Sequence, residues 1–197
     1  EKYDIVVFDS MKDMYEQLSI KEERYGLSRL VAGYSWPWAS QKDKNAIDIE
    51  IDGVELQWNK TDKDWINSED SFRQVGCIHT TQGYDLNYTG VIFGEEISFN
   101  NATREIEIDK SKYFDKNGKR GLDNIEELKT YIINIYKTIM FRGIKGVYIY
   151  ACDKNLREYF KEHISPYKSE SKLRILPFTD VKPYVNAVPI FDIYAAA

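Results

Sequence analysis

The first part of the chain alternates between the apolar spacing of a strand and that of a helix. Residues 4–8 (DIVVF) form a short, almost continuous apolar run, which predicts a buried strand. Between residues 11 and 18 the apolar positions recur at helical spacing, and Asp9 or Ser10 can cap the predicted helix. A second strand is expected at the start of LSRLVAGYSWPW, ending in Gly33 and an aromatic corner, where Pro37 stops regular structure. The order strand, helix, strand indicates an α/β unit.

Strict alternation of apolar and polar residues then predicts two antiparallel hairpins. The segment AIDIEIDGVELQW alternates on both sides of Asp52 and Gly53, a dipeptide that favours a tight hairpin turn. The segments EISFN and REIEID alternate in the same way around Asn100 and Asn101. The polar, lysine-rich segment that follows, DKSKYFDKNGKRG, predicts an exposed loop. Its lysines could contact phosphates or could simply be solvated.

The rest of the chain alternates between buried strands and helices. Strands are expected in VGCIHT and TGVIFG, which are joined by a polar turn with a short helical stretch, and in GVYIYAC. A long helix is expected over residues 123–141, with one apolar face, and a second helix begins after a cap at Asp153. Such alternation predicts an α/β fold with a mostly parallel sheet, into which the antiparallel hairpins are inserted.

Length and composition set the domain organisation that we expect. With 197 residues, 43% of them hydrophobic, the chain can bury one substantial core. We assign residues 1–180 to this domain and residues 181–197 to a linker or a lead-in to a further domain. The first residue is not Met, no signal peptide is visible, and no apolar run approaches the roughly 20 residues of a membrane span. We therefore expect a segment of a longer protein, with neighbours on both sides and no membrane partner.

Charge and cysteine content restrict the function classes. The net charge of −5 argues against a domain that grips nucleic acid by bulk electrostatics, although a local basic edge can coexist with it. Cys77 and Cys152 lie in apolar runs, where buried reduced thiols are common, so we expect a cytoplasmic protein. Two His and two Cys in no ligand-like spacing give little support for a zinc site.

Polar residues between two buried strands form the first candidate site. In an α/β sheet, ligands bind where parallel strands end at their carboxyl edges. We therefore expect a set of six polar or glycine residues to emerge together at one binding edge. The set is His79, Thr80, Thr81, Gln82, Gly83 and Asp85. The alternative is a polar loop whose His79 and Gln82 are hydrogen-bonded internally.

Three cations form the second candidate site, at the junction of the long helix and the next strand. Lys137, Arg142 and Lys145 cluster there, in NIYKTIMFRGIKGVYIYACD. Cations at a helix C-terminus complement the helix dipole. A guanidinium also binds phosphate oxygens in bidentate fashion and stabilises the charge that develops in phosphoryl transfer. Both interpretations are open on these residues alone.

Taken together, the two segments resemble a known family. HTTQGYDLNYTGVIFGEE is similar to motif V of superfamily 1 helicases, and NIYKTIMFRGIKGVYIYACD is similar to motif VI, in the expected order. The best resemblance is to the Schlafen group 3-like DNA/RNA helicase domain, whose members also show segments similar to LSRLVAGYSWPW and LREYF. It extends over about residues 3–180. It implies the second RecA-like domain of a motor ATPase, a three-layer α/β fold of the phosphate-loop NTPase type.

The resemblance also implies roles for individual residues. Arg142 matches the arginine finger, which reaches across an interdomain cleft to the γ-phosphate of ATP. Cofactor contacts are implied for Gln82, Gly83 and Asp85, with Arg29 as a weaker candidate for a nucleotide or interdomain contact. For Arg29 the alternative is an ordinary surface arginine. Nucleic-acid contacts are expected for His79, Thr80, Thr81, Lys137 and Lys145.

Two positions depart from the family pattern, and one motif is missing. Phe141 stands where a threonine usually precedes the arginine, and Asp85 stands where many relatives have glutamate. The phosphate-loop pattern G-x-x-x-x-G-K-[ST] does not occur. Glu95 and Glu96 end a buried strand as Walker B acids do, but we interpret them as part of motif V.

We therefore expect ATP and Mg²⁺ to bind mainly to an upstream phosphate-loop domain of the same protein. The chain would be inactive alone, and its polymer partner would be single-stranded DNA or RNA. The alternative function is a non-catalytic nucleic-acid-binding or regulatory module on a helicase-like fold. A nuclease has no support, because no metal-binding set of carboxylates can be assembled.

Overall fold

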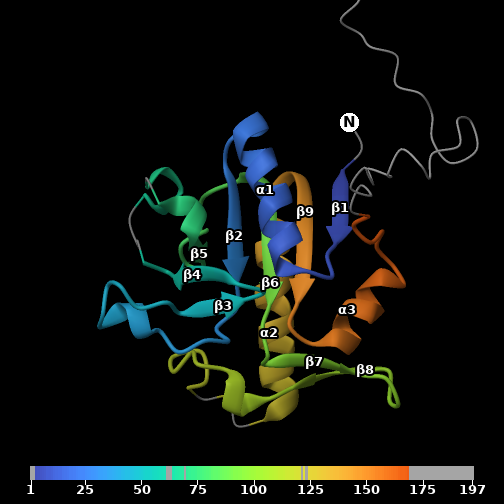
Figure 1. Cartoon of the computed structure of the whole chain (residues 1–197). Coiled ribbons are helices and arrows are strands. Elements are labelled where there is room, and N and C mark those ends of the chain that lie inside the picture. Colours follow the sequence, from blue (N-terminus) through green and yellow to red (C-terminus); the bar gives the residue numbers. More distant parts are fainter. Residues whose placement is uncertain (1–2, 61–63, 69, 121, 123, 169–197) are drawn as a thin grey trace, which may run out of the picture. The chain divides into compact units, whose positions relative to one another are not determined.

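A seven-stranded sheet with α1 on one face and α2 on the other forms the frame of the molecule (Figure 1). The computed structural model describes residues 3–60, 64–68, 70–120, 122 and 124–168. The strands and helices, in chain order, are β1 (Asp4–Val7), α1 (Met11–Tyr25), β2 (Ser28–Ala32), β3 (Ile49–Ile51), β4 (Val54–Trp58), β5 (Gln74–Gly76), β6 (Leu86–Phe93), β7 (Ile97–Asn100), β8 (Glu105–Ile108), α2 (Ile125–Met140), β9 (Gly143–Ala151) and α3 (Lys154–Lys161).

The strand order is β1-β9-β6-β2-β5-β4-β3, with a separate two-stranded sheet of β7 and β8. Every neighbouring pair from β1 to β4 is parallel, and β3 alone runs antiparallel to its neighbour β4. The predicted mostly parallel α/β sheet with hairpin inserts is confirmed. We call the side at which the parallel strands begin the N-terminal edge and the side at which they end the C-terminal edge.

The predicted hairpins and helix caps are present. Asp52 and Gly53 both have positive φ angles, +53° and +75°, as a two-residue hairpin turn requires. Ser10 caps α1 by accepting the Asp13 N–H, and Asp52 of the hairpin accepts the Met11 N–H at 2.7 Å. The β3–β4 hairpin is therefore attached to the start of α1.

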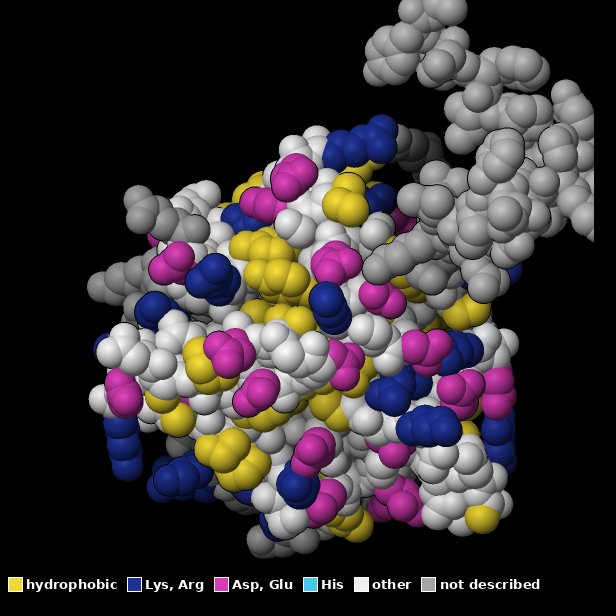
Figure 2. All heavy atoms as spheres, viewed as in Figure 1, with side chains coloured by type: hydrophobic (Ala, Val, Ile, Leu, Met, Phe, Trp, Pro, Cys, Tyr) yellow, Lys and Arg dark blue, Asp and Glu magenta, His cyan; other side chains and the backbone are white. Residues whose placement is uncertain are grey.

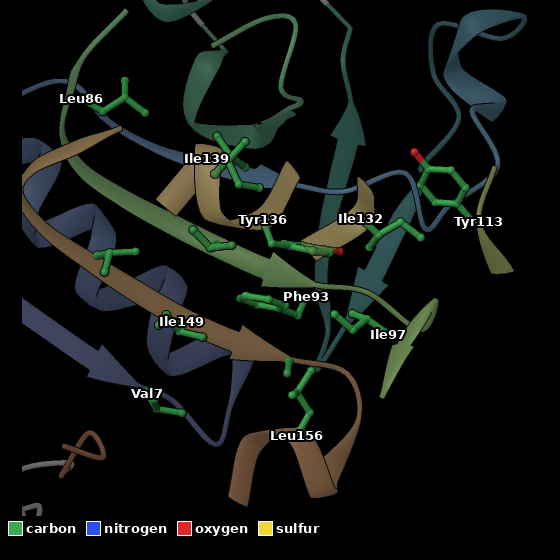
Figure 3. Close-up of a cluster of buried hydrophobic side chains, with 14 of the residues drawn as sticks. Val7, Leu86, Phe93, Ile97, Tyr113, Ile132, Tyr136, Ile139, Ile149 and Leu156 are labelled. Atoms are coloured by element: carbon green, nitrogen blue, oxygen red, sulfur yellow. The ribbon is translucent and has the colours of Figure 1, made fainter. Parts of the chain in front are cut away.

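The core is divided by the sheet. On one face, α1 packs through Met11, Met14 and Leu18. On the other face, α2 buries the predicted apolar positions, and α3 adds Leu156. Figure 3 shows this second cluster, in which the Phe93 and Tyr136 rings stack at 4.1 Å.

Contacts group residues 1–167 into one compact unit. The boundary that we predicted at residue 180, and the proposed linker of residues 181–197, lie outside the described residues. None of the helices in the described part of the chain is long and apolar enough to cross a bilayer.

Candidate functional site

The segment of residues 77–85 runs along the sheet instead of staying at one edge. It leaves the end of β5 and enters the start of β6, and both strands are parallel to β2, which lies between them. Gly76 at the end of β5 and Val91 in β6 both pair with Val31 of β2. Val91 is five residues after Leu86, where β6 begins, so segment 77–85 covers roughly 16 Å along the strand direction. The expected gathering of six residues at one edge is therefore wrong. A connection between parallel strands has to return to the opposite edge.

The first half of this segment lies at the C-terminal edge and is closed by two threonines. The Thr80 hydroxyl oxygen accepts the Cys77 N–H at 2.7 Å, and the Thr81 hydroxyl donates to the Cys77 carbonyl at 3.1 Å. Both threonine side chains are buried. Their hydroxyls hold a hydrogen-bonded turn where a short helical stretch was predicted. His79 is exposed, with its ring 6.3 Å from the Tyr34 ring.

The second half of the segment reaches the N-terminal edge. Asp85 lies there because the next residue, Leu86, begins β6. Gln82, Gly83 and Asp85 are all exposed, and Gly83 has a φ of +84°, a conformation that favours glycine. Among the described residues, neither the Gln82 nor the His79 side chain makes a hydrogen bond, so the alternative of internal bonding for these two is not supported.

Arg142 lies at the same edge as Asp85. The Leu86 N–H donates to the Arg142 carbonyl at 2.8 Å, so Asp85 and Arg142 stand at the starts of neighbouring strands. The Arg142 side chain is half-buried, and its Nε is buried without a hydrogen-bond partner. Within the described part of the chain no carboxylate pairs with it, Asp85 included. The guanidinium charge is therefore not neutralised by any carboxylate of the described residues.

A β-bulge follows Arg142. Two residues of β9, Ile144 and Lys145, stand against Asn87 of β6, and bulges are common where a side chain must be re-aimed. Two exposed apolar residues lie close to Arg142 in the sequence. Phe141 is 83% exposed and Ile144 is 63% exposed.

The two predicted lysines belong to this same edge. Lys137 is exposed on the last turn of α2, and the Lys145 ammonium lies 5.4 Å from the Tyr25 ring. The five residues expected to contact nucleic acid are thus divided between opposite edges of the sheet. Lys137 and Lys145 accompany Arg142, whereas His79, Thr80 and Thr81 do not.

Arg29 is buried, so the surface alternative for this residue is wrong. Its guanidinium pairs with Glu22 of α1 at 2.7 Å and donates to the carbonyls of Ser28 and Ile66, at 2.9 and 2.5 Å. These contacts tie α1 and β2 to the turn that contains Ile66. The guanidinium of Arg29 is therefore ion-paired and hydrogen-bonded inside the domain.

The two acids at the end of β6 have different environments. Glu95 is exposed and pairs with Lys112 at 2.7 Å. Glu96 is fully buried, and the Tyr136 hydroxyl donates to its Oε1 at 2.5 Å, while Oε2 has no hydrogen-bond partner. Burial raises the pKa of Glu96, and the hydroxyls of Tyr136 and Ser35 oppose this increase. The acids do not form a shared metal-facing pair.

Sequence reasoning missed the pair of Glu96 and Tyr136. The available signal was glycine at Gly33 and Gly94, on the strand exits around the carboxyl group. A Cβ on Gly33 would lie 2.7 Å from Glu96 Oε1, and one on Gly94 would lie 2.4 Å from Oε2. The glycines leave the space that the buried carboxyl group occupies.

Comparison with known proteins identifies the family of the chain. Residues 1–153 match the family described as Schlafen group 3, DNA/RNA helicase domain. The chain is 32% identical over 167 residues to a protein of Saccharomyces cerevisiae that is described as uncharacterized. That alignment covers 80% of this chain and 36% of the yeast protein, so the chain spans about a third of that relative. No solved structure matches the chain significantly.

Proposed function

This chain belongs to the Schlafen group 3 DNA/RNA helicase domain family, and we propose that it is the second RecA-like half of an ATP-dependent nucleic-acid motor. The observation that carries the proposal is the state of Arg142. Its guanidinium is half-buried, is not paired with a carboxylate in the described part of the chain, and stands beside the exposed end of segment 77–85. An unneutralised arginine at an open edge is suited to a phosphate group supplied by another domain.

In the proposed mechanism, ATP and Mg²⁺ bind mainly to a phosphate-loop domain elsewhere in the same protein. Arg142 approaches the γ-phosphate in trans and stabilises the negative charge that spreads over its oxygens during transfer. Asp85 borders the same site, Gln82 is the exposed residue three positions before it, and Gly83 would let the backbone come close to the nucleotide.

Segment 77–85 provides the proposed coupling. It begins beside His79 at the C-terminal edge and ends beside Arg142 at the N-terminal edge, so one short connection touches both proposed sites. Closure of the two domains around ATP would press on its end and displace its beginning. Movement of single-stranded DNA or RNA at the C-terminal edge would follow from domain closure and reopening.

The test is ATP hydrolysis by the full-length protein, with and without single-stranded DNA or RNA. We expect nucleic acid to stimulate turnover, and Arg142→Ala to lower kcat by about 10³-fold or more. Arg142→Lys keeps the charge and loses the fork of donors, so it should recover only part of the rate. Arg24→Ala is the control, because Arg24 is an exposed arginine at the same edge.

One observation favours a second candidate function. Phe141 replaces the threonine that usually precedes the arginine in the family, which is compatible with a non-catalytic binding or regulatory module. If the full-length protein binds nucleic acid without hydrolysing ATP, or if Arg142→Ala equals wild type, this module becomes the better assignment.

A further inference from the structure

The lysine-rich segment of residues 109–120, here called the basic loop, is fixed to the C-terminal edge beside His79. Tyr113 is fully buried, and Figure 3 shows it at the margin of the α2-side core. The Phe114 N–H donates to the Tyr34 carbonyl at 2.7 Å. The Tyr34 ring meets Tyr113 edge-on at 6.2 Å and His79 edge-on at 6.3 Å. Tyr34 therefore places the basic loop and the exposed histidine at the same edge.

The basic loop is positive within an acidic chain. It contains five Lys or Arg and two Asp, whereas the whole chain has a net charge of −5. Both acids are directed to backbone donors. Asp109 accepts the Ser111 N–H at 2.9 Å, and buried Asp115 accepts the N–H groups of Asn117 and Gly118 at 2.9 and 2.8 Å. These bonds shape the loop and leave its cations to dominate the exposed surface.

Three of the five cations are engaged within the domain. Lys110 donates to the Leu122 carbonyl, Lys119 donates to the Lys110 carbonyl, and Lys112 pairs with Glu95. Lys116 and Arg120 are exposed, and in the described part of the chain their side chains have no ion pair or hydrogen bond. The loop is thus preformed, with two cations available to an external anion.

An exposed aromatic ring accompanies these cations. Phe114 is 40% exposed, although its neighbours Tyr113 and Asp115 are buried. The face of the molecule that carries α1 has a different distribution of charge. Figure 2 shows positive and negative side chains interspersed there. A hollow of about 810 Å³ on that face is lined by equal numbers of cations and acids, which are Lys12, Lys44, Lys60, Arg73, Glu16, Asp52, Glu55 and Asp70.

We propose that the basic loop is a binding surface for single-stranded nucleic acid, on which a base stacks against Phe114 while Lys116 and Arg120 contact the flanking phosphates. This inference rests on the proposed function, and it names the surface that would hold the polymer. Single strands are bound by combining cations that follow the backbone with aromatic rings on which unstacked bases lie. The loop joins His79 in one path at the C-terminal edge, opposite the edge of Arg142.

The experiment measures binding of a fluorescently labelled single-stranded oligonucleotide, DNA and RNA in turn, to the full-length protein over a range of salt concentrations. Lys116→Glu and Arg120→Glu should each weaken binding and reduce the slope of log K against log salt by about 0.7. Phe114→Ala should weaken binding about 5- to 100-fold, and Phe114→Tyr should restore most of it because a ring is kept. Arg24→Glu makes the same charge change at the opposite edge and should leave affinity near wild type.

Binding of heparin separates recognition of a single strand from attraction of any polyanion. Phe114→Ala should leave heparin binding unchanged, because heparin has no bases to stack. The inference is overturned if Phe114→Ala binds single strands as tightly as wild type, or if it weakens heparin and single strands equally. Thermal unfolding of each variant shows whether the loop substitutions have left the fold intact.

The outcome is distinguishable from failure of the proposed function. Unchanged oligonucleotide affinity in the loop variants, together with nucleic-acid-stimulated ATP hydrolysis in wild type, rejects the loop and retains the motor. Weakened affinity in the loop variants, together with full activity of Arg142→Ala, retains the loop and rejects the arginine finger. If the wild-type protein binds neither single-stranded DNA nor RNA, both proposals fail.

Discussion

The buried pair of Tyr136 and Glu96 leads to a stability prediction that isolates one oxygen atom. In Tyr136→Phe the ring keeps its stacking on Phe93, at 4.1 Å and 13° between planes, because only the hydroxyl is removed. Two groups lose their partner. The Gly94 N–H, which donates to the Tyr136 oxygen at 3.0 Å, and Glu96 Oε1 are both left buried and unpaired. Each such group costs about 1–3 kcal/mol, so we expect a loss of about 2–6 kcal/mol in the free energy of unfolding.

The same substitution should change how stability depends on pH. Burial raises the pKa of Glu96 above the 4.5 of a free carboxyl group, and the Tyr136 hydroxyl partly offsets this. Because the pKa is higher in the folded state, the folded state holds the proton more tightly. The contribution of Glu96 is therefore fully present below about pH 4.5 and is lost as pH rises through the folded pKa, by at most about 1.4 kcal/mol per pH unit. Tyr136→Phe should extend this loss to higher pH, and Glu96→Gln should remove it.

The assay is urea unfolding of the chain, followed by tryptophan fluorescence at several pH values. Tyr131→Phe is the matched control, because Tyr131 is on the same helix and 38% exposed, and it should change stability by less than about 0.5 kcal/mol. A loss of stability in Tyr136→Phe no larger than in this control would contradict the predicted cost of the two unpaired groups. The same pH dependence of stability in Glu96→Gln and wild type would contradict the role given to Glu96.

Two further predictions concern the strand exits. In Gly94→Ala the new Cβ would lie 2.1 Å from Ser35 Cβ, so we expect a loss of about 1–3 kcal/mol in urea unfolding. The same change in a Ser35→Gly background should cost less, and equal costs in both backgrounds would contradict the steric explanation. Burial raises the pKa of Cys152 to about 12, so a thiol reagent at neutral pH should label it only on unfolding, with Cys152→Ser identifying its signal. Labelling of native protein at the rate of a free thiol would contradict this.

Local patterns in the sequence were sufficient to predict most elements of this fold. The Asp52-Gly53 dipeptide, the cap at Ser10 and the apolar face of α2 each act within a few residues, and the structure confirms all three. Pairing of distant strands carries no such local signal. For that reason the prediction that residues 79–85 gather at one edge of the sheet was wrong. The residues of segment 77–85 indicate a polar turn, but only the parallel pairing of β5 and β6 with β2 shows that the segment must return to the opposite edge of the sheet.

The site was harder to predict than the fold because residue type does not specify burial. Arg29 and Glu96 are of residue types that are ordinarily charged and exposed to solvent. Each is buried against a partner on another element, Glu22 of α1 for the arginine and Tyr136 of α2 for the glutamate. The opposite holds for Phe141, an apolar residue that the structure leaves 83% exposed beside Arg142.

Segment 77–85 and α2 both run from the C-terminal edge of the sheet to the N-terminal edge, and this bears on how the proposed motor function would be tested. Segment 77–85 joins His79 to Asp85, and α2 joins the buried pair at the C-terminal edge to Arg142. Helical side chains point back toward the helix N-terminus, which lets Tyr136 reach Gly94 from late in α2. If the proposed motor function holds, a substitution at the C-terminal edge would lower ATP turnover by the full-length protein without contacting the nucleotide. The free energy of unfolding distinguishes a direct loss of activity at Arg142 from an indirect loss through α2. Arg142 is not paired in the described structure, so its removal should leave the free energy of unfolding almost unchanged.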